Sequence, residues 1–281
     1  MKIIECPRDA MQAVATFIDT QTKIHYLNKL LEVGFDTLDF GSFVSPAVVP
    51  QMRDTAAVLA GLDLSVGKTK LMTLVANLRG AQQAADFEQI GYLAFPLSLS
   101  ESFQLKNTNQ TISEAFAELA RVQELCGKSN KTLVTYLSMS FGNPYGEPYS
   151  TEIVEDFTEK LAKMGATIIC LSDSTGSSTT DEIKALFGAL TARFPAIEFG
   201  AHLHAKYGHT AKKTKAAYKS GVRRIDCALR GFGGCPMPAE KLIGNLATEL
   251  VVSELRKLGA NVSLDDTKLA VAMLQSQYIF E

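Results

Sequence analysis

The sequence predicts an α/β protein with a single (β/α)8 barrel, in which residues 1–281 form one TIM-barrel domain with extra C-terminal helices. The length of 281 residues is close to the roughly 250 residues of a typical barrel of this kind. Short apolar segments alternate with amphipathic ones along the chain, as in parallel βαβ units. No GxGxxG pattern follows the first apolar segment, so the usual signature of an open dinucleotide-binding sheet is missing.

Eight apolar segments are predicted to be strands, and the segments between them have the periodicity of helices. The predicted strands are Lys2–Glu5, Thr37–Phe40, Lys70–Val75, Gln89–Phe95, Thr132–Met139, Thr167–Leu171, Ile197–Ala201 and Arg223–Ala228. The predicted helices are Thr22–Val33, Val48–Ala60, Ser113–Cys126, Thr151–Met164, Thr180–Thr191 and Thr210–Ser220. After the eighth strand, Leu242–Leu258 and Asp265–Ile279 are predicted to form further helices that cover the outside of the barrel.

The composition excludes several classes of function. A formal net charge of −2 argues against nucleic-acid binding, which needs a basic surface. The sequence contains no run of about 18 apolar residues, so we expect no membrane span. The first residues are too polar for a signal peptide. The five cysteines form no CxxC pair, which is typical of a reducing compartment. We therefore expect a cytoplasmic protein.

His202 and His204 are the strongest candidates for metal ligands. Residues i and i+2 of a strand point to the same face, so both imidazoles should lie together at the end of the seventh strand. Neutral imidazoles in such a pair are good ligands for a divalent ion. The alternative is a pair of hydrogen-bonded histidines without a metal. His209 is expected to face solvent, and His25 to be structural.

Three further polar segments follow predicted strands or lie near the last one. Asp9 could complete a metal site after the first strand, with Arg8 as a fixed cation for an oxyanion; the alternative is a solvated Arg8–Asp9 salt bridge. A glycine-rich loop carries Cys235, which could act as an acid or nucleophile or be incidental. Asn245 could offer an amide oxygen to a metal or simply begin a helix.

These signals coincide at one place in the predicted fold. Asp9, Asp39, Asp173 and the two histidines all lie at predicted C-terminal strand ends, where barrel enzymes assemble their active sites. Mixed imidazole, carboxylate and amide ligands suit Mg²⁺ or Mn²⁺, or Zn²⁺.

At these residues the chain resembles 3-hydroxy-3-methylglutaryl-CoA (HMG-CoA) lyase, within a wider superfamily of metal-dependent barrel lyases and Claisen-type synthases. The resemblance runs from about Ile3 to Leu250. It is carried by ECPRDAMQ from Glu5, SFVSP from Ser42, VPQM from Val49, Glu101 to Asn109, Asn143-Pro144-Tyr145, Asp173-Ser174-Thr175-Gly176, His202-Leu203-His204, Gly233-Gly234-Cys235-Pro236 and GNLATE from Gly244.

The resemblance implies a set of roles for these residues. By position, the metal ligands of the family fall on Asp9, His202, His204 and Asn245.

The other implied roles are catalytic. The enolate-stabilising arginine of the family falls on Arg8, and its loop cysteine, a proton donor, falls on Cys235. Asp173 matches an acidic residue near the reacting hydroxyl, and Asp39 matches a glutamate of the second strand.

The chain departs from the family pattern at four places. Asp39 is one methylene shorter than the glutamate. Ala205 replaces the acidic residue that usually follows the second histidine. A residue is missing before Pro7, and Ala10 stands where a glycine is usual. The segment from Cys235 to Asn245 is one residue longer. The metal ligands are all present, so the departures concern the acyl group more than the metal chemistry.

The resemblance implies retro-Claisen cleavage of HMG-CoA, or of a similar 3-hydroxyacyl-CoA, to acetyl-CoA and acetoacetate with a divalent cation. Two alternatives stay open: a Claisen-type synthase or aldolase of the same superfamily that acts on a 2-oxo acid, and a non-catalytic barrel that binds an acyl-CoA. Lys106 is a candidate for binding the phosphates of coenzyme A, and a homodimer is expected.

Overall fold

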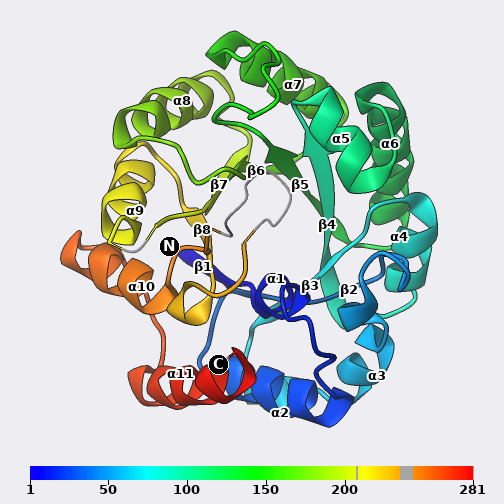
Figure 1. The fold of residues 1–281 in the computed structure, drawn as a ribbon, viewed down its shortest axis with the longest axis vertical. Helices are drawn as coiled ribbons and strands as arrows, with labels where there is room; N and C mark the ends of the chain where they lie inside the picture. The colour runs from blue at the N-terminus through cyan, green and yellow to red at the C-terminus, as the bar shows by residue number, and fades with distance from the viewer. Residues whose placement is uncertain (207, 235–242, 281) are drawn as a thin grey trace.

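Eight parallel strands form a closed barrel in the computed structural model of this chain, which describes residues 1–206, 208–234 and 243–280. The strands follow one another around the barrel in chain order, and β1 pairs with β8 to close it. They are β1 (Lys2–Glu5), β2 (Thr37–Ser42), β3 (Lys70–Leu74), β4 (Ile90–Ser98), β5 (Thr132–Ser138), β6 (Ile168–Asp173), β7 (Glu198–Leu203) and β8 (Arg224–Cys227). Figure 1 shows the ring of helices around the strands. The predicted (β/α)8 barrel is confirmed.

Helices connect and follow the strands. They are α1 (Pro7–Gln12), α2 (Thr20–Leu31), α3 (Thr55–Ala60), α4 (Leu78–Ala85), α5 (Glu101–Thr108), α6 (Ile112–Lys128), α7 (Thr151–Lys163), α8 (Thr180–Arg193), α9 (Thr210–Lys219), α10 (Thr248–Lys257) and α11 (Asp266–Phe280). Most of them surround the barrel, whereas α1 lies inside this ring, beside β2 (Figure 1). Short 3₁₀ turns are η1 (Pro50–Met52), η2 (Leu64–Val66) and η3 (Leu229–Gly231). The sequence did not predict α1, α4 or α5, and the predicted helix Val48–Ala60 is divided into η1 and α3.

Local signals account for the start of several helices. Thr111 and Glu114 form a capping box at the start of α6, and Thr179 and Glu182 form another at α8. In each, the threonine hydroxyl accepts a hydrogen bond from a free backbone N–H while the glutamate accepts one in return. These caps fix where the helices begin after the preceding loops.

The core has two layers because side chains alternate along each strand. A small cluster fills the inside of the barrel, and a larger one lies between the strands and the helices. The inner cluster consists of Ile4, Cys6, Met72, Tyr92, Ala94, Val134, Ile168 and Cys170. The end of the barrel that carries the strand C-termini is therefore left to polar side chains.

The last two helices follow β8, as predicted. Helix α10 begins later than expected, because Asn245 and Ala247 form isolated β-bridges with His204 and Ala228 before it. Helix α11 lies beside α2 (Figure 1). No helix in the described ranges is long and apolar enough to cross a membrane.

Candidate active site

Asp9, His202 and His204 come together at the C-terminal end of the barrel. His202 belongs to β7 and His204 follows it, and their ring centroids lie 5.3 Å apart. One ligand atom from each histidine and from the Asp9 carboxylate lie within 4.8 Å of one another. The two imidazoles share one side of the strand, as their spacing predicted. Residues separated by about two hundred positions thus form one candidate metal site.

The His204 side chain is buried without a hydrogen-bond partner. Neither Nδ1 nor Nε2 has one among the described residues, although the residue is only 2% exposed. Buried polar atoms are normally hydrogen-bonded, so these two nitrogens have the chemistry of metal-ligand atoms. Burial, and then the charge of His202, lower the pKa of His204 to about 4. The ring is therefore neutral near pH 7, the form that binds metals.

Asp9 lies in the first turn of α1, not in the turn expected after β1. Its Oδ2 accepts hydrogen bonds from Asn245 Nδ2 (2.6 Å) and from the backbone N–H of Gly234 (3.2 Å). Burial raises the pKa of Asp9, but the charge of Arg8, then those of the histidines and the Asn245 hydrogen bond, outweigh it and bring the pKa to about 2. Asp9 is thus a permanent carboxylate in the group.

Arg8 is buried and joins two acidic side chains. Its Nε and Nη2 donate to Asp39 Oδ2 (3.0 and 2.6 Å), and its Nη1 donates to Asp9 Oδ1 (3.3 Å) and Gln12. The Arg8 and Asp9 side chains are only 10% and 14% exposed, so the expected alternative holds for the ion pair itself but not for its solvation. Burial raises the pKa of Asp39, and the charge and hydrogen bonds of Arg8 only partly offset it. The guanidinium is held in one orientation by these carboxylates.

A cavity of about 390 Å³ lies above these groups. Its wall includes Arg8, Asp9, His202 and His204. The wall also contains hydroxyl groups and apolar side chains, among them Tyr136, Ser138, Ser172, Ser174, Val44, Val48, Leu74 and Phe103. A small polar acyl group with an apolar extension fits such a wall.

The comparisons with known proteins agree with this geometry. A family profile described as HMGL-like matches residues 2–274, nearly the whole barrel. The chain belongs to the HMGL-like family.

Members of the HMGL-like family that are similar to this chain share its full length and fold. The mitochondrial hydroxymethylglutaryl-CoA lyase of Macaca fascicularis is 34% identical over 275 residues, covering 97% of this chain and 83% of the relative. The crystal structure of the Bacillus subtilis HMG-CoA lyase is 31% identical with a TM-score of 0.92, covering 99% of this chain and 93% of that one. An HMG-CoA lyase from Acinetobacter baumannii, solved with coenzyme A and 3-methylmalate, is 29% identical with a TM-score of 0.90, covering 99% and 90%.

One residue that matches the HMGL-like pattern lies apart from the others. Asp173 is the last residue of β6, and its neighbours Ser172 and Ser174 line the cavity instead. The Asp173 carboxylate accepts hydrogen bonds from Lys213 Nζ (2.6 Å) and from Ser178, and Asp173 is fully buried. The strand extends two residues beyond its predicted end, and alternation along it directs Asp173 away from the cavity.

The remaining expected residues have mixed positions. Cys235 lies outside the described residues. Lys106 is exposed at the edge of the cavity, with Nζ 4.4 Å from the centroid of the Tyr145 ring. His209 is exposed, as expected, and His25, which was expected to be structural, is exposed as well; both lie outside the candidate site.

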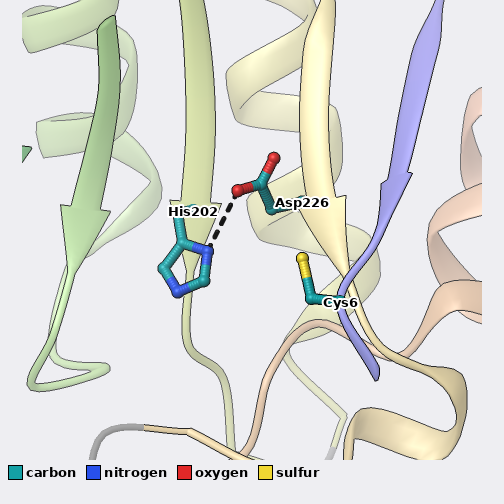
Figure 2. A group of neighbouring side chains, drawn as sticks. All are labelled: Cys6, His202 and Asp226. Carbon is teal, nitrogen blue, oxygen red and sulfur yellow. Dashed lines mark hydrogen bonds and ion pairs between the residues drawn. The ribbon is translucent and has the colours of Figure 1, made fainter. Parts of the chain in front are cut away.

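Asp226, which was not predicted to be a site residue, lies beside His202 and holds its ring. His202 Nδ1 lies 3.2 Å from Asp226 Oδ2 (Figure 2). The same oxygen accepts a hydrogen bond of 2.6 Å from the Tyr136 hydroxyl. Burial lowers the pKa of His202, but the hydrogen bond and charge of Asp226 outweigh it and the pKa is raised. With Nδ1–H directed at Asp226, Nε2 is the nitrogen available to an ion, an arrangement common around metal-binding histidines.

Cys6 lies beside this pair in the barrel. Its Sγ, an Asp226 oxygen and a His202 nitrogen form a second group within 4.8 Å (Figure 2). Burial, then the charges of Asp226 and Asp39, raise the pKa of the Cys6 thiol far above its usual value. A protonated thiol is a poor metal ligand, so the group of Asp9, His202 and His204 is the better candidate.

Proposed function

We propose that this chain cleaves HMG-CoA, or a closely similar 3-hydroxyacyl-CoA, to acetyl-CoA and acetoacetate. The proposal rests on one observation above all: Asp9, His202 and His204 converge beside the guanidinium of Arg8 in a single cavity. The names of the similar lyases and the match of the family profile over residues 2–274 support it.

A divalent cation would be held by Asp9, His202, His204 and Asn245. Two neutral imidazoles, one carboxylate and one amide oxygen suit Mg²⁺ or Mn²⁺, or Zn²⁺. The unpartnered buried nitrogens of His204 support this assignment. Asn245 directs Nδ2 toward Asp9, so its amide would have to turn to offer Oδ1 to an ion.

The cation, when bound, would lower the pKa of the substrate hydroxyl and orient the substrate. The hydroxyl proton passes to a general base, water or a histidine of the site, and the bond between the hydroxyl-bearing carbon and the α-carbon of the thioester breaks. The hydroxyl-bearing carbon becomes the ketone of acetoacetate, and the electron pair stays on the other fragment as the enolate of acetyl-CoA. That enolate then takes a proton at carbon, for which the family resemblance implies Cys235.

Arg8 is placed to stabilise the enolate oxygen. It lines the cavity, and its orientation is fixed by Asp39 and Asp9 before any substrate binds. A preorganised cation loses no energy to reorientation as negative charge develops. Asp173 is not proposed as the base, because Lys213 and Ser178 already donate to its carboxylate.

The coenzyme A part of the substrate is expected at the open side of the cavity. A relative was solved with coenzyme A, which supports binding of an acyl-CoA. Lys106, exposed at this edge, is proposed to contact the phosphates. The homodimer, the cytoplasmic location and the presence of one domain over residues 1–281 stay predictions from the sequence.

The test is an assay of the metal-loaded protein with HMG-CoA. Purified protein is freed of metal with a chelator, reloaded with Mg²⁺ or Mn²⁺, and assayed for acetoacetate release. We expect turnover that depends on the added ion and is absent in Asp9→Asn. If neither Mg²⁺ nor Mn²⁺ nor another divalent metal supports acetoacetate release, the proposal is overturned.

Two control reactions separate the alternatives. Acetyl-CoA offered with a panel of 2-oxo acids should release no free thiol; release would identify a Claisen-type synthase. Binding of metal and acyl-CoA by calorimetry without turnover of either mixture would identify a non-catalytic acyl-CoA-binding barrel. The sequence motifs shared with HMG-CoA lyases and the full-length likeness to them favour the lyase.

A further inference from the structure

The two candidate histidine ligands are held in different ways. The ring of His202 is fixed by a hydrogen bond from Nδ1 to Asp226. The ring of His204 makes no hydrogen bond to any described residue. Metal-binding histidines normally have an outer partner that orients the ring. Because His204 has none among the described residues, the place of its imidazole depends on how its main chain is held.

Lys213 contacts that main chain. It lies in α9 with a side chain that is 4% exposed, and its Nζ donates to the backbone carbonyl of His204 at 2.7 Å. The same ammonium group lies 2.6 Å from Asp173 Oδ2, 3.0 Å from the Gly176 carbonyl and 3.0 Å from Ser178 Oγ. An ammonium has three hydrogens, so these four acceptors use all of its capacity.

The contacts of Lys213 join three segments at the cavity. They link α9 to the chain just after β7, which carries His204, and to the loop after β6. On the opposite side of His204, the backbone N–H of Ala205 donates to the Gly244 carbonyl, and His204 forms a β-bridge with Asn245. Main-chain hydrogen bonds therefore fix this residue from both sides.

Asp173 is the counter-ion that makes a buried ammonium possible here. Its carboxylate is fully buried, and it also accepts hydrogen bonds from the backbone N–H and hydroxyl of Ser178. A buried lysine without an anionic partner is strongly disfavoured. This pair accounts for the position of Asp173 behind the cavity wall.

We propose that Lys213 is a positioning residue for His204. Through the His204 carbonyl it holds the imidazole at the place where the cation binds, while Asp173 compensates its charge. The inference rests on the proposed metal site and assigns to this lysine–aspartate pair a role outside the chemical steps.

The test compares Lys213→Met with a matched control, Lys23→Met. Lys23 is the other buried lysine within the described ranges (1% exposed); its Nζ lies 2.7 Å from Asp54 Oδ1 and also donates to the Gln51 carbonyl. It contacts none of the candidate ligands. Because each substitution leaves a buried or partly buried carboxylate unpaired, both should lower thermal stability.

Metal affinity distinguishes the two lysines. Calorimetric titration of chelator-treated protein with Mn²⁺ should give a Kd about 10-fold or more weaker in Lys213→Met, the size typical of lost outer-sphere support, and an unchanged Kd in Lys23→Met. Activity at saturating Mn²⁺ should recover much of the loss in Lys213→Met, because the chemical groups are intact.

A double variant separates positioning from charge. Lys213→Met with Asp173→Asn removes the unpaired carboxylate, so it should regain stability and fold even if the single variant does not. Its Mn²⁺ affinity should stay weak, because the contact to the His204 carbonyl is still missing. Wild-type affinity in this double variant overturns the inference. Absence of Mn²⁺ binding by the wild-type protein refutes the proposed metal site itself, so the two failures are distinguishable.

Discussion

Replacing Asp226 with asparagine tests how the barrel holds its metal ligands. The Asp226 side chain is fully buried, and its Oδ2 is hydrogen-bonded to both the Tyr136 hydroxyl and His202 Nδ1. Asparagine has nearly the same shape, so its carbonyl oxygen can keep both contacts. The substitution therefore removes charge with little change in packing.

The expected loss follows from these contacts. A hydrogen bond to a charged group contributes about 1.5–3 kcal/mol and a neutral one about 0.5–1.5 kcal/mol, so the His202 contact weakens by about 1–1.5 kcal/mol. The amide also places an NH₂ where Oδ1, which has no partner among the described residues, now lies. Together these effects predict a Kd for Mn²⁺ about 10- to 100-fold weaker, the range seen when outer partners of metal ligands are changed.

The measurement is a Mn²⁺ titration of chelator-treated wild type, Asp226→Asn and a control, Cys6→Ala. Cys6 neighbours the same pair (Figure 2), but within the described part of the chain its Sγ donates a hydrogen bond only to the backbone oxygen of Ile4, at 3.8 Å. We expect the control to bind Mn²⁺ like wild type. A Kd for Asp226→Asn within twofold of wild type would refute the orienting role, and an equal loss in Cys6→Ala would show that the thiol is a ligand.

Three further predictions concern catalysis, pH and metal linkage. Arg8→Gln should lower the rate of acetoacetate release by ~10²–10³, the usual effect of removing a preorganised oxyanion donor. Because the substitution also leaves Asp39 unpaired, we expect a lower melting temperature. Normal turnover in this variant would remove Arg8 from the mechanism. Burial outweighs the hydrogen bonds from Thr248 and Leu229 and raises the pKa of Glu5 from 4.5 to about 8. The folded state therefore favours the protonated form, and this contribution, complete below pH 4.5, is lost as the pH rises to about 8. Glu5→Gln should thus gain stability over wild type as the pH rises in urea titrations, and a constant difference would contradict the assignment. Mn²⁺ at a hundred times its Kd should stabilise the wild type by about 2.7 kcal/mol in thermal unfolding and leave His204→Ala unshifted; an equal shift in both would exclude His204 as a ligand.

The architecture could be predicted from the sequence because most strands contain a short apolar run and these runs alternate with amphipathic segments; β8 (RIDC) is the exception. The helices that were missed lack a comparable pattern. Helix α1 has only six residues and depends on Pro7 at its first position, and α5 distributes its polar residues around the helix. Tertiary pairing decided where α10 starts, since Asn245 and Ala247 bond to strand ends far away in the chain.

The candidate site was predictable only where one strand carries the signal. The His202 and His204 spacing was enough to place both rings on one side. Asp9 and Asn245 were candidates by position with open alternatives, and the family pattern then favoured them as ligands. The positions of Asp173 and Asp226 could be predicted only from the exact end of each strand and the face on which each residue lies. A shift of one residue decides whether a side chain points into the barrel. An acidic residue within a predicted buried strand, as at Asp226, is the signal that could have been used.

The charges around the cavity bear on why a divalent ion belongs there. Asp9, Asp39 and Asp226 contribute three carboxylates to this end and the interior of the barrel, and Arg8 and the fully buried Arg224 contribute two guanidinium groups. With both histidines deprotonated, the form in which they bind a metal, this assembly carries one net negative charge in a low-dielectric region, where unbalanced charge is costly. A divalent cation reverses the sign, and the carboxylate of an HMG-type acyl group restores neutrality. The protein without its ion is thus electrostatically suited to the cation, and the loaded protein to an anionic substrate. Arg224→Met should therefore strengthen the binding of the cation and weaken the binding of the acyl carboxylate. We expect a lower Kd for Mn²⁺ and a higher KM for the acyl-CoA substrate, and these opposite changes would support the charge balance.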